Sequence, residues 1–299
     1  MGRILRKGKW DGIWDRPKYQ EMRDKIINEF KGLTFVEEGH RYFLNGKEMM
    51  CVSNVAHMFQ EHFDSHQKAQ ETYERNFSNP QSKYFGMTAD EIEKAWEENS
   101  RKACEHGTER HEFAECAFYF LTGQNDRIYP EFRDRITEDG GFEAIYPKEE
   151  AVVRFYEDMP QCVIPILAEV KVYYEEENWG YSGTFDLIAY YDAELEGKNP
   201  SRSGIMVLDW KTNKDLYKNF MEKTLLPPLD GLLDCPLSIY KAQLSLYQNC
   251  LENIGIKVIA RRIMWLRPDG MYHKIPLEDY SKRIISFLHK KYEKELQVV

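Results

Sequence analysis

Hydrophobic residues recur along the chain at two spacings, which distinguish strands from helices. Apolar runs that are continuous or alternate with polar residues, bounded by Gly, Asn or Pro, predict strands. These strands are expected within residues 33–50, 163–175, 181–191, 205–211, 258–266 and 271–276. Asn45-Gly46 predicts a tight hairpin turn in the first segment. The turn at 178–180 predicts that the next two segments also form a hairpin.

Apolar residues spaced three and four positions apart predict helices between the strands. These helices are expected at residues 19–30, after Ser53, and at 88–104, 108–123, 148–157, 239–251 and 279–296. Gly107 is expected to separate the third helix from the fourth, for which Thr108 is the candidate N-cap. Residues 67–87, with Asn79-Pro80 as a breaker, are expected to be a loop. Residues 124–160 are acidic and rich in loop signals, which indicates an insertion or a surface arm.

The composition is that of a folded globular protein. The chain has 299 residues, of which 42% are hydrophobic and 30% charged, so it is long enough for one large domain or two ordinary ones. The formal net charge of −9 argues against a nucleic-acid binder whose whole surface is basic. Residues 1–20, however, carry six Lys or Arg against two Asp, and residues 256–291 carry nine against three acids. Such local basic patches can attract a polyanion even when the total charge is negative.

The chain lacks several features that would indicate other classes of protein. Six cysteines occur without any Cys-x-x-Cys spacing, which favours reduced thiols over a disulfide framework or a zinc ribbon. No initial apolar segment has the pattern of a secretion signal, and no run is long enough to span a bilayer. A soluble, cytoplasmic protein is therefore expected. The motif Gly-x-x-x-x-Gly-Lys-Ser/Thr is absent, so no ATP-driven motor is expected.

Two predicted strands carry carboxylates among apolar residues. One strand ends in Asp209-Trp210-Lys211, and because side chains alternate along a strand, Asp209 and Lys211 share one face while Trp210 takes the other. Asp186 lies inside another apolar strand, where burial without a partner would be unfavourable. Asp186 therefore needs a metal ion, a base or an exposed face. Gly183 before it permits the close approach of another part of the chain.

Two predicted helices carry polar pairs spaced four residues apart, which places each pair on one helical face. His111 and Glu115 form the first pair, and Gln243 and Tyr247 form the second. Each pair has an ordinary structural interpretation: a buried His paired with Glu, and a packed Tyr beside a solvated Gln. The residues alone leave the structural and functional interpretations open, but several separate elements each present one or two polar residues.

In chain order these residues resemble the PD-(D/E)XK nucleases, and within them the RecB-like and phage-type exonucleases. The resemblance rests on four motifs that are degenerate alone and specific together: Gly107-Thr108-x-x-His111, Gly183-Thr184-x-Asp186, Asp209-Trp210-Lys211 and Gln243-x-x-x-Tyr247. It covers about residues 104–267. It implies an α/β fold, with a mixed central sheet flanked by helices in a restriction-endonuclease-like core. This core would span 96–299, with the acidic insertion near 124–160, and an N-terminal accessory region at 1–95 would pack on it.

The resemblance also implies roles for individual residues. Four groups would be ligands of one or two Mg²⁺ or Mn²⁺ ions: His111, Asp186, Asp209 and the backbone carbonyl of Trp210. Lys211 would orient or activate the attacking water, while Glu169 would bind a second metal ion or hold Lys211. Gln243 and Tyr247 would contact the nucleic acid near the scissile phosphate. No iron–sulfur cluster is expected, because no cysteine cluster follows Cys250.

The function that the resemblance implies is metal-dependent DNA exonuclease activity in recombination, repair or processing, of a phage or mobile-element type. Linear DNA would be the substrate. A single-strand annealing or recombination protein, and further copies of the chain in a homo-oligomer, are the candidate protein partners. Two alternatives stay open: a structure- or site-specific endonuclease on the same core, and a non-catalytic nucleic-acid-binding module. The polarity of cleavage, the strand preference and the choice between DNA and RNA also stay open.

Overall fold

The centre of the fold is a mixed β-sheet. The computed structural model describes residues 2–219 and 222–297. The strands lie in the order β10-β9-β8-β7-β4-β3-β2, and β6 pairs with β7 outside this path. The sheet strands are β2 Leu33–Val36, β3 Arg41–Leu44, β4 Lys47–Cys51, β6 Val163–Glu175, β7 Gly180–Tyr191, β8 Gly204–Lys211, β9 Val258–Leu266 and β10 Tyr272–Pro276. The β4–β7 and β8–β9 pairs are parallel and the other pairs are antiparallel, so the expected mixed sheet is confirmed.

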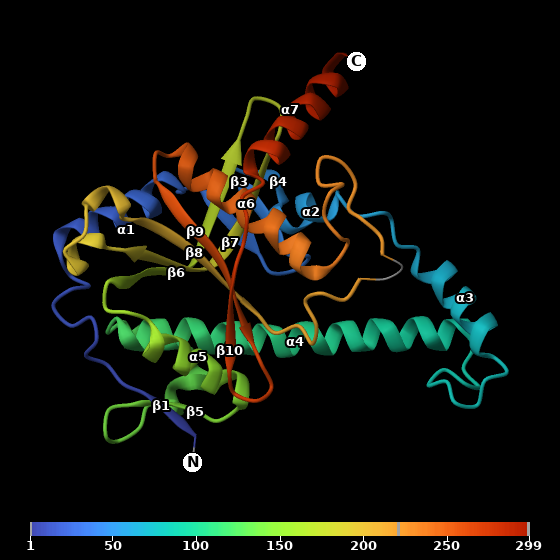
Figure 1. Ribbon diagram of the computed structural model, residues 1–299, viewed down its shortest axis with the longest axis horizontal. Helices are drawn as coiled ribbons and strands as arrows, with labels where there is room; N and C mark the ends of the chain where they lie inside the picture. Colours follow the sequence, from blue (N-terminus) through green and yellow to red (C-terminus); the bar gives the residue numbers. More distant parts are fainter. Residues whose placement is uncertain (1, 220–221, 298–299) are drawn as a thin grey trace.

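Helices flank the sheet on both faces (Figure 1). They are α1 Pro17–Glu29, α2 Val52–His57, α3 Ser65–Asn76, α4 Ala89–Leu121, α5 Pro147–Asp158, α6 Pro236–Asn253 and α7 Ser281–Gln297. The helices α4 and α5 lie on one side of the sheet, and α2 and α6 lie on the other. A small second sheet, formed by β1 Arg3–Leu5 and β5 Phe142–Ala144, lies beyond α4 and α5. The expected α/β architecture is therefore present.

The prediction that Gly107 separates two helices is wrong, because the single helix α4 runs unbroken from Ala89 to Leu121. Thr108 caps no second helix: its hydroxyl donates to the Cys104 carbonyl, 3.2 Å away and one turn earlier in the same helix. Arg101 forms ion pairs with glutamates three residues before and four residues after it, which supports this exposed stretch. These contacts and the long flanking segments outweigh the cost of one helical glycine, about 1 kcal/mol.

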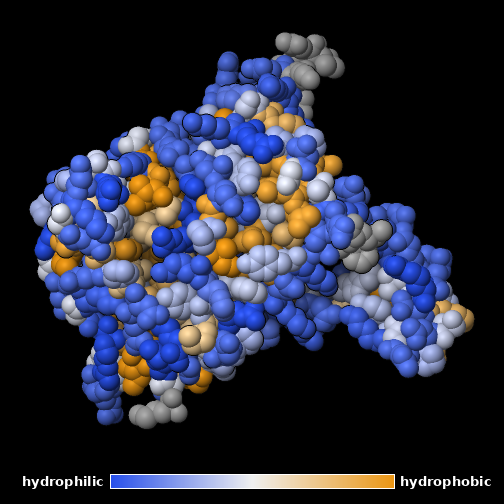
Figure 2. Space-filling model, in the orientation of Figure 1, coloured by the Kyte–Doolittle hydropathy of each residue, from blue (hydrophilic) through white to orange (hydrophobic). Residues whose placement is uncertain are grey.

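The loop expected at residues 67–87 is also wrong in its first half, where α3 lies. Asp64 caps this helix by accepting the backbone N–H of Gln67 at 2.9 Å. Within α3 only Ala69 is buried, so the helix has no apolar stripe from which it could have been predicted. Together with the first half of α4 it extends from one end of the body (Figure 1). The surface of this end is mainly hydrophilic (Figure 2).

Residues 124–160 belong to the core and do not form a surface arm. Phe142 of β5 stacks on Phe113 and Phe120 of α4, with ring centroids 5.2 and 5.4 Å apart. The helix expected at 148–157 is confirmed as α5, and its Phe155 packs edge-on against Trp210 at 4.9 Å. Most acidic residues of this segment are exposed or half-buried, while Glu149 is buried, and the inner face of α5 covers the sheet.

The N-terminal strands are part of the main sheet. The hairpin expected at Asn45-Gly46 joins β3 to β4, and β4 pairs with β7 at Tyr181 and Ser182. The helix α2 then packs on α6. Residue 95 lies inside α4, and the division of the chain at that point stays a prediction. Among residues 2–219 and 222–297, no helix combines the length and the apolar character that crossing a bilayer requires.

Candidate active site

A gap in the pairing of β7 creates the space for the candidate site. β4 pairs with β7 at residues 181–182, and β8 pairs with it at residues 187–191. Between these two ladders, the described strands leave one edge of β7 uncovered. The Asp186 carboxylate fills part of this gap by accepting the backbone N–H of Trp210, with Oδ2 2.6 Å from the nitrogen. Asp186 therefore links two strands just beyond the point where their ladder ends.

His111 and Glu169 lie beside Asp186. His111 projects from α4, and its Nδ1 is 3.3 Å from Asp186 Oδ2. Glu169 comes from β6 and has a φ of 49°, an unusual backbone conformation that interrupts the regular ladder with β7. One ligand atom from each of these three residues lies within 4.8 Å of the others. Three separate elements thus gather an imidazole and two carboxylates.

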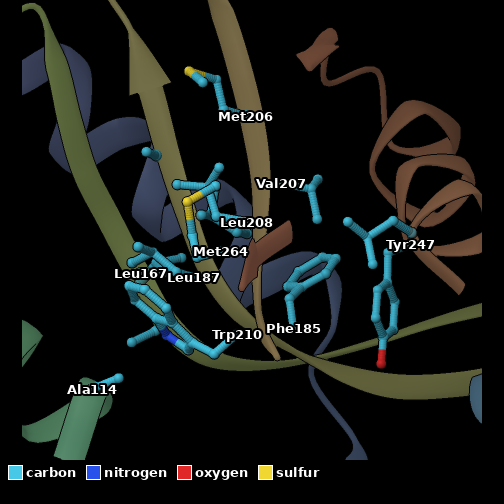
Figure 3. Packing of buried hydrophobic residues seen from close by; sticks show 14 of the residues in the cluster. Ala114, Leu167, Phe185, Leu187, Met206, Val207, Leu208, Trp210, Tyr247 and Met264 are labelled. Carbon is cyan, nitrogen blue, oxygen red and sulfur yellow. The ribbon is translucent and has the colours of Figure 1, made fainter. Parts of the chain in front are cut away.

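Asp209 and Lys211 share one face of β8, as strand alternation predicts. Lys211 Nζ is 2.5 Å from Asp209 Oδ2, and the side chains are 13% and 3% exposed, so the ion pair is buried. The ammonium also lies 4.5 Å from the ring centre of Tyr240 on α6, a residue that the sequence did not single out. Trp210 points to the opposite side, beside leucines of β6 and β7 (Figure 3). The Asp-x-Lys sequence is therefore held by packing on both faces.

The carboxyl groups of the site have pKa values displaced in opposite directions. Burial, followed by the charge of Asp186, raises the pKa of Asp209 to about 6. Burial, then Asp186 and two further carboxylates, raises the pKa of Glu169 well above its ordinary value. Burial also opposes ionisation of Asp186, but the neighbouring His111 and Lys211 outweigh it and lower the pKa of that carboxyl. Carboxylates this close together ionise fully only when further positive charge compensates them.

The two basic groups respond to the same charges. Burial alone would lower the pKa of His111, but the Asp186 carboxylate and its hydrogen bond outweigh this and raise the pKa. Burial likewise disfavours charged Lys211, but Asp209 and Asp186 outweigh it and raise the pKa of the ammonium. A metal ligand must be a neutral imidazole, so a metal ion at His111 would compete with a proton for the ring nitrogen.

The donor set fits a divalent cation. Carboxylate oxygens suit Mg²⁺ and Mn²⁺, and an imidazole nitrogen suits a transition metal such as Mn²⁺. A cation here would also compensate the burial and the repulsion that raise the pKa values of Glu169 and Asp209. The grouping differs from the expected ligand set, because Glu169 lies with His111 and Asp186 while Asp209 is paired with Lys211. Ligation by Asp209 and by the Trp210 carbonyl stays a prediction.

Gln243 and Tyr247 meet on one face of α6, with Gln243 Nε2 donating to the Tyr247 hydroxyl at 3.5 Å. The Tyr247 side chain is buried, and its ring packs edge-on against Phe185 at 5.0 Å (Figure 3). A Cβ on Gly183 would lie 2.9 Å from this ring, so the glycine permits the close approach. Packing is the role that these contacts give Tyr247. Contact of either residue with nucleic acid stays a prediction.

A polar cluster one helical turn beyond His111 was not predicted as part of the site. The buried Glu115 carboxylate accepts hydrogen bonds from the hydroxyls of Tyr119 and Tyr129, each at 2.5 Å. Its charge contributes to the raised pKa of Glu169, so this cluster adjoins the donor set. The spacing of Glu115 from His111 was the signal in the sequence. The contact with Tyr129, which lies beyond the end of α4, could be found only from the fold.

Comparisons with known proteins add little to this geometry. No family model matches the chain, and no curated protein matches it significantly. Among solved structures, the chain is similar to a protein described as a "Putative exonuclease" from Eubacterium rectale. The two share 15% sequence identity, the match covers 84% of this chain and 80% of that chain, and the TM-score is 0.39. A likeness at this level carries no argument, so the interpretation of the site rests on its residues.

Proposed function

We propose that this chain is a metal-dependent nuclease with a PD-(D/E)XK core that removes nucleotides from the ends of DNA. The observation that supports this most is the convergence of one imidazole, three carboxylates and a buried lysine from α4, β6, β7 and β8. Perturbed pKa values of this kind, caused by burial and by neighbouring charges, concentrate at functional sites. The order of the motifs along the chain supports the RecB-like exonuclease type.

In the proposed hydrolysis of a phosphodiester bond, some side chains would bind the metal ion and others would orient the attacking water. His111, Glu169 and Asp186 would hold Mg²⁺ or Mn²⁺, which supplies Lewis-acid polarisation of the phosphate. Lys211, held in place by Asp209 and the Tyr240 ring, can orient a water molecule and offset the negative charge that develops on the phosphate. Because these groups come from packed strands and a long helix, their positions are fixed before the substrate binds.

The proposed setting is DNA recombination, repair or processing of a phage or mobile-element type, with a single-strand annealing or recombination protein as the partner. This setting is supported by the resemblance of the motifs. The exonuclease, the endonuclease and the binding module make different predictions for one experiment, so they can be separated directly.

Digestion of linear and covalently closed circular DNA, each with Mg²⁺, with Mn²⁺ and with EDTA, tests the proposal. We expect loss of linear DNA in either metal, intact circles, and no cleavage in EDTA. Asp186→Asn is the matched control, since it keeps the shape of the side chain and removes its charge. Cleavage of closed circles would favour the endonuclease, binding without cleavage would favour the binding module, and full activity in EDTA would contradict the metal requirement.

A further inference from the structure

Two exposed tyrosines flank the end of β8, where Lys211 lies. The side chains of Tyr146 and Tyr217 are 50% and 57% exposed. Tyr146 contacts an arginine directly, and Tyr217 is linked to an arginine through the ring of Trp265. Neighbours of both tyrosines bind the backbone just after Lys211. Exposed aromatic rings held beside cations at the edge of the candidate site present open faces on which a planar ligand group can stack.

Tyr217 belongs to an aromatic cluster beside Lys211. Its ring lies edge-on to that of Trp265, with centroids 6.2 Å apart. Trp265 is the cross-strand neighbour of Lys211 in the β8–β9 ladder, so the two side chains share one face. The indole Nε1 donates to the Asn213 carbonyl at 2.7 Å, and the Arg267 guanidinium lies 4.1 Å from the indole ring centre. This cluster is therefore fixed in position next to the catalytic lysine.

Tyr146 is held equally firmly on the α4 side. The Arg110 guanidinium, next to His111 in sequence, lies 4.7 Å from its ring centre. The fully buried Glu149 accepts the backbone N–H of Tyr146 at 3.1 Å and pairs with Arg110 and Arg135 at 3.5 and 3.3 Å. One carboxylate thus orients both the tyrosine backbone and the arginines around its ring.

A lysine lies between the two aromatic positions. Lys148 Nζ donates to the Thr212 carbonyl at 2.8 Å, immediately after Lys211. Burial, followed by the charges of Arg110 and Arg267, lowers the pKa of Lys148. The cations of both aromatic positions, Arg110 and Arg267, therefore repel the charge of Lys148 at the end of β8. A bound phosphate would relieve this repulsion.

We propose that Tyr146 and the Tyr217–Trp265 cluster are base-stacking platforms, and that Arg110, Lys148 and Arg267 bind the phosphates between them, so that the substrate enters the site as an unpaired strand. The inference deepens the proposed nuclease function and rests on it. Stacking on aromatic rings above a basic track is how single strands are bound without sequence preference. In a duplex the faces of the bases are already stacked on one another, so the rings could reach them only after the end has opened.

Binding measured without cleavage separates this inference from the nuclease proposal. In EDTA, fluorescence anisotropy of a labelled oligothymidylate and of a labelled blunt duplex would be recorded for the wild type, Tyr146→Ala, Tyr217→Ala and the two corresponding Phe variants. Phe77→Ala, which removes an equally exposed ring from the end of α3, is the matched control. Circular dichroism checks that each variant is folded.

We expect each Ala variant to weaken binding of the single strand about 5- to 150-fold, the range that loss of one base–aromatic stack produces. The Phe variants should bind like the wild type, and duplex binding should be unchanged. Lys148→Met should reduce the slope of log affinity against log salt concentration for the single strand by the amount of about one phosphate contact. Wild-type affinity in both Ala variants, equal loss of duplex binding, or a similar loss in Phe77→Ala would overturn the inference. A nuclease proposal that fails for lack of cleavage would leave these affinities unaffected, so the two failures are distinguishable.

Discussion

Replacement of Lys211 by methionine would test the role of the buried ion pair. Methionine keeps much of the volume of the side chain and its apolar contact with the Tyr240 ring, and it removes the ammonium. The change leaves Asp209 without the cation that now lies 2.5 Å from its carboxylate. It removes no ligand atom from the donor set around Asp186. The variant therefore separates positioning of the water and charge compensation from metal binding.

We expect the substitution to weaken stabilisation of the transition state more than binding of the metal ion or the substrate. Removal of one preorganised charged group lowers the rate by about 10²–10³, or ~3–4 kcal/mol. A buried charge left without its partner destabilises a protein by ~3–5 kcal/mol. Asp209 can escape most of this cost by binding a proton, because its pKa is already raised to about 6 and loss of Lys211 raises it further. We therefore expect a variant that is only mildly destabilised near pH 6 and more clearly destabilised at higher pH.

Single-turnover digestion of labelled linear DNA measures the rate, and calorimetry with Mn²⁺ measures metal affinity. Lys211→Met should bind Mn²⁺ and DNA within a few-fold of wild type and turn over at least about 100-fold more slowly. Lys241→Met is the matched control: it breaks a lysine–glutamate pair of 2.8 Å in which the lysine is nearly as buried as Lys211 and the glutamate is exposed, and it should leave the rate unchanged. Turnover of Lys211→Met near the wild-type rate would refute the assignment of β8 as the catalytic strand.

Three further predictions follow from the same contacts. His111→Ala should abolish tight Mn²⁺ binding in calorimetry with little change in melting temperature; the reverse pattern would mean that His111 is a structural core residue. Ionisation of Asp209 opposes folding because its pKa is raised, so in EDTA the melting temperature of the wild type relative to Asp209→Asn should fall as the pH rises from about 4 through about 6. A melting-temperature difference that is constant with pH would show that the pKa of Asp209 is the same in the folded and unfolded states. Gly183→Ala places a Cβ 2.9 Å from the Tyr247 ring and should destabilise the fold by ~1–3 kcal/mol in urea unfolding, with recovery when Tyr247→Leu is added.

Local patterns in the sequence were enough to predict most strands and one feature of the site. Alternation along β8 predicted that Asp209 and Lys211 share a face, and their ion pair confirms it. The helix α3 could not be predicted, because it buries only Ala69 and so lacks a helical apolar period. The continuity of α4 through Gly107 was also missed, because a glycine in a sequence signals a break while a glycine in a long, ion-paired helix is tolerated.

Contacts between distant elements explain what else the sequence could not show. Glu169 was expected to bind a second metal ion or hold Lys211; its carboxylate lies with His111 and Asp186, at a residue of positive φ in β6. A period-two pattern assumes a regular strand, so it contains no information about such an irregularity. The partners of Glu115 and the pairing of β4 with β7 are likewise non-local, and no window of sequence contains both members.

The interrupted edge of β7 explains why the site forms where it does. If the β7–β8 ladder continued beyond Leu187 and Leu208, Asp186 and Asp209 would lie directly opposite each other, and like charges in that arrangement destabilise a sheet. Instead β8 continues only beside β9, and the Trp210 N–H that the ladder would have bonded to a carbonyl is bonded to the Asp186 carboxylate. The gap thus exchanges a backbone hydrogen bond for one to a charged side chain. It leaves the carboxylates of Asp186 and Asp209 facing a space into which α4 places the imidazole of His111. The end of the β7–β8 ladder therefore creates the position of the donor set.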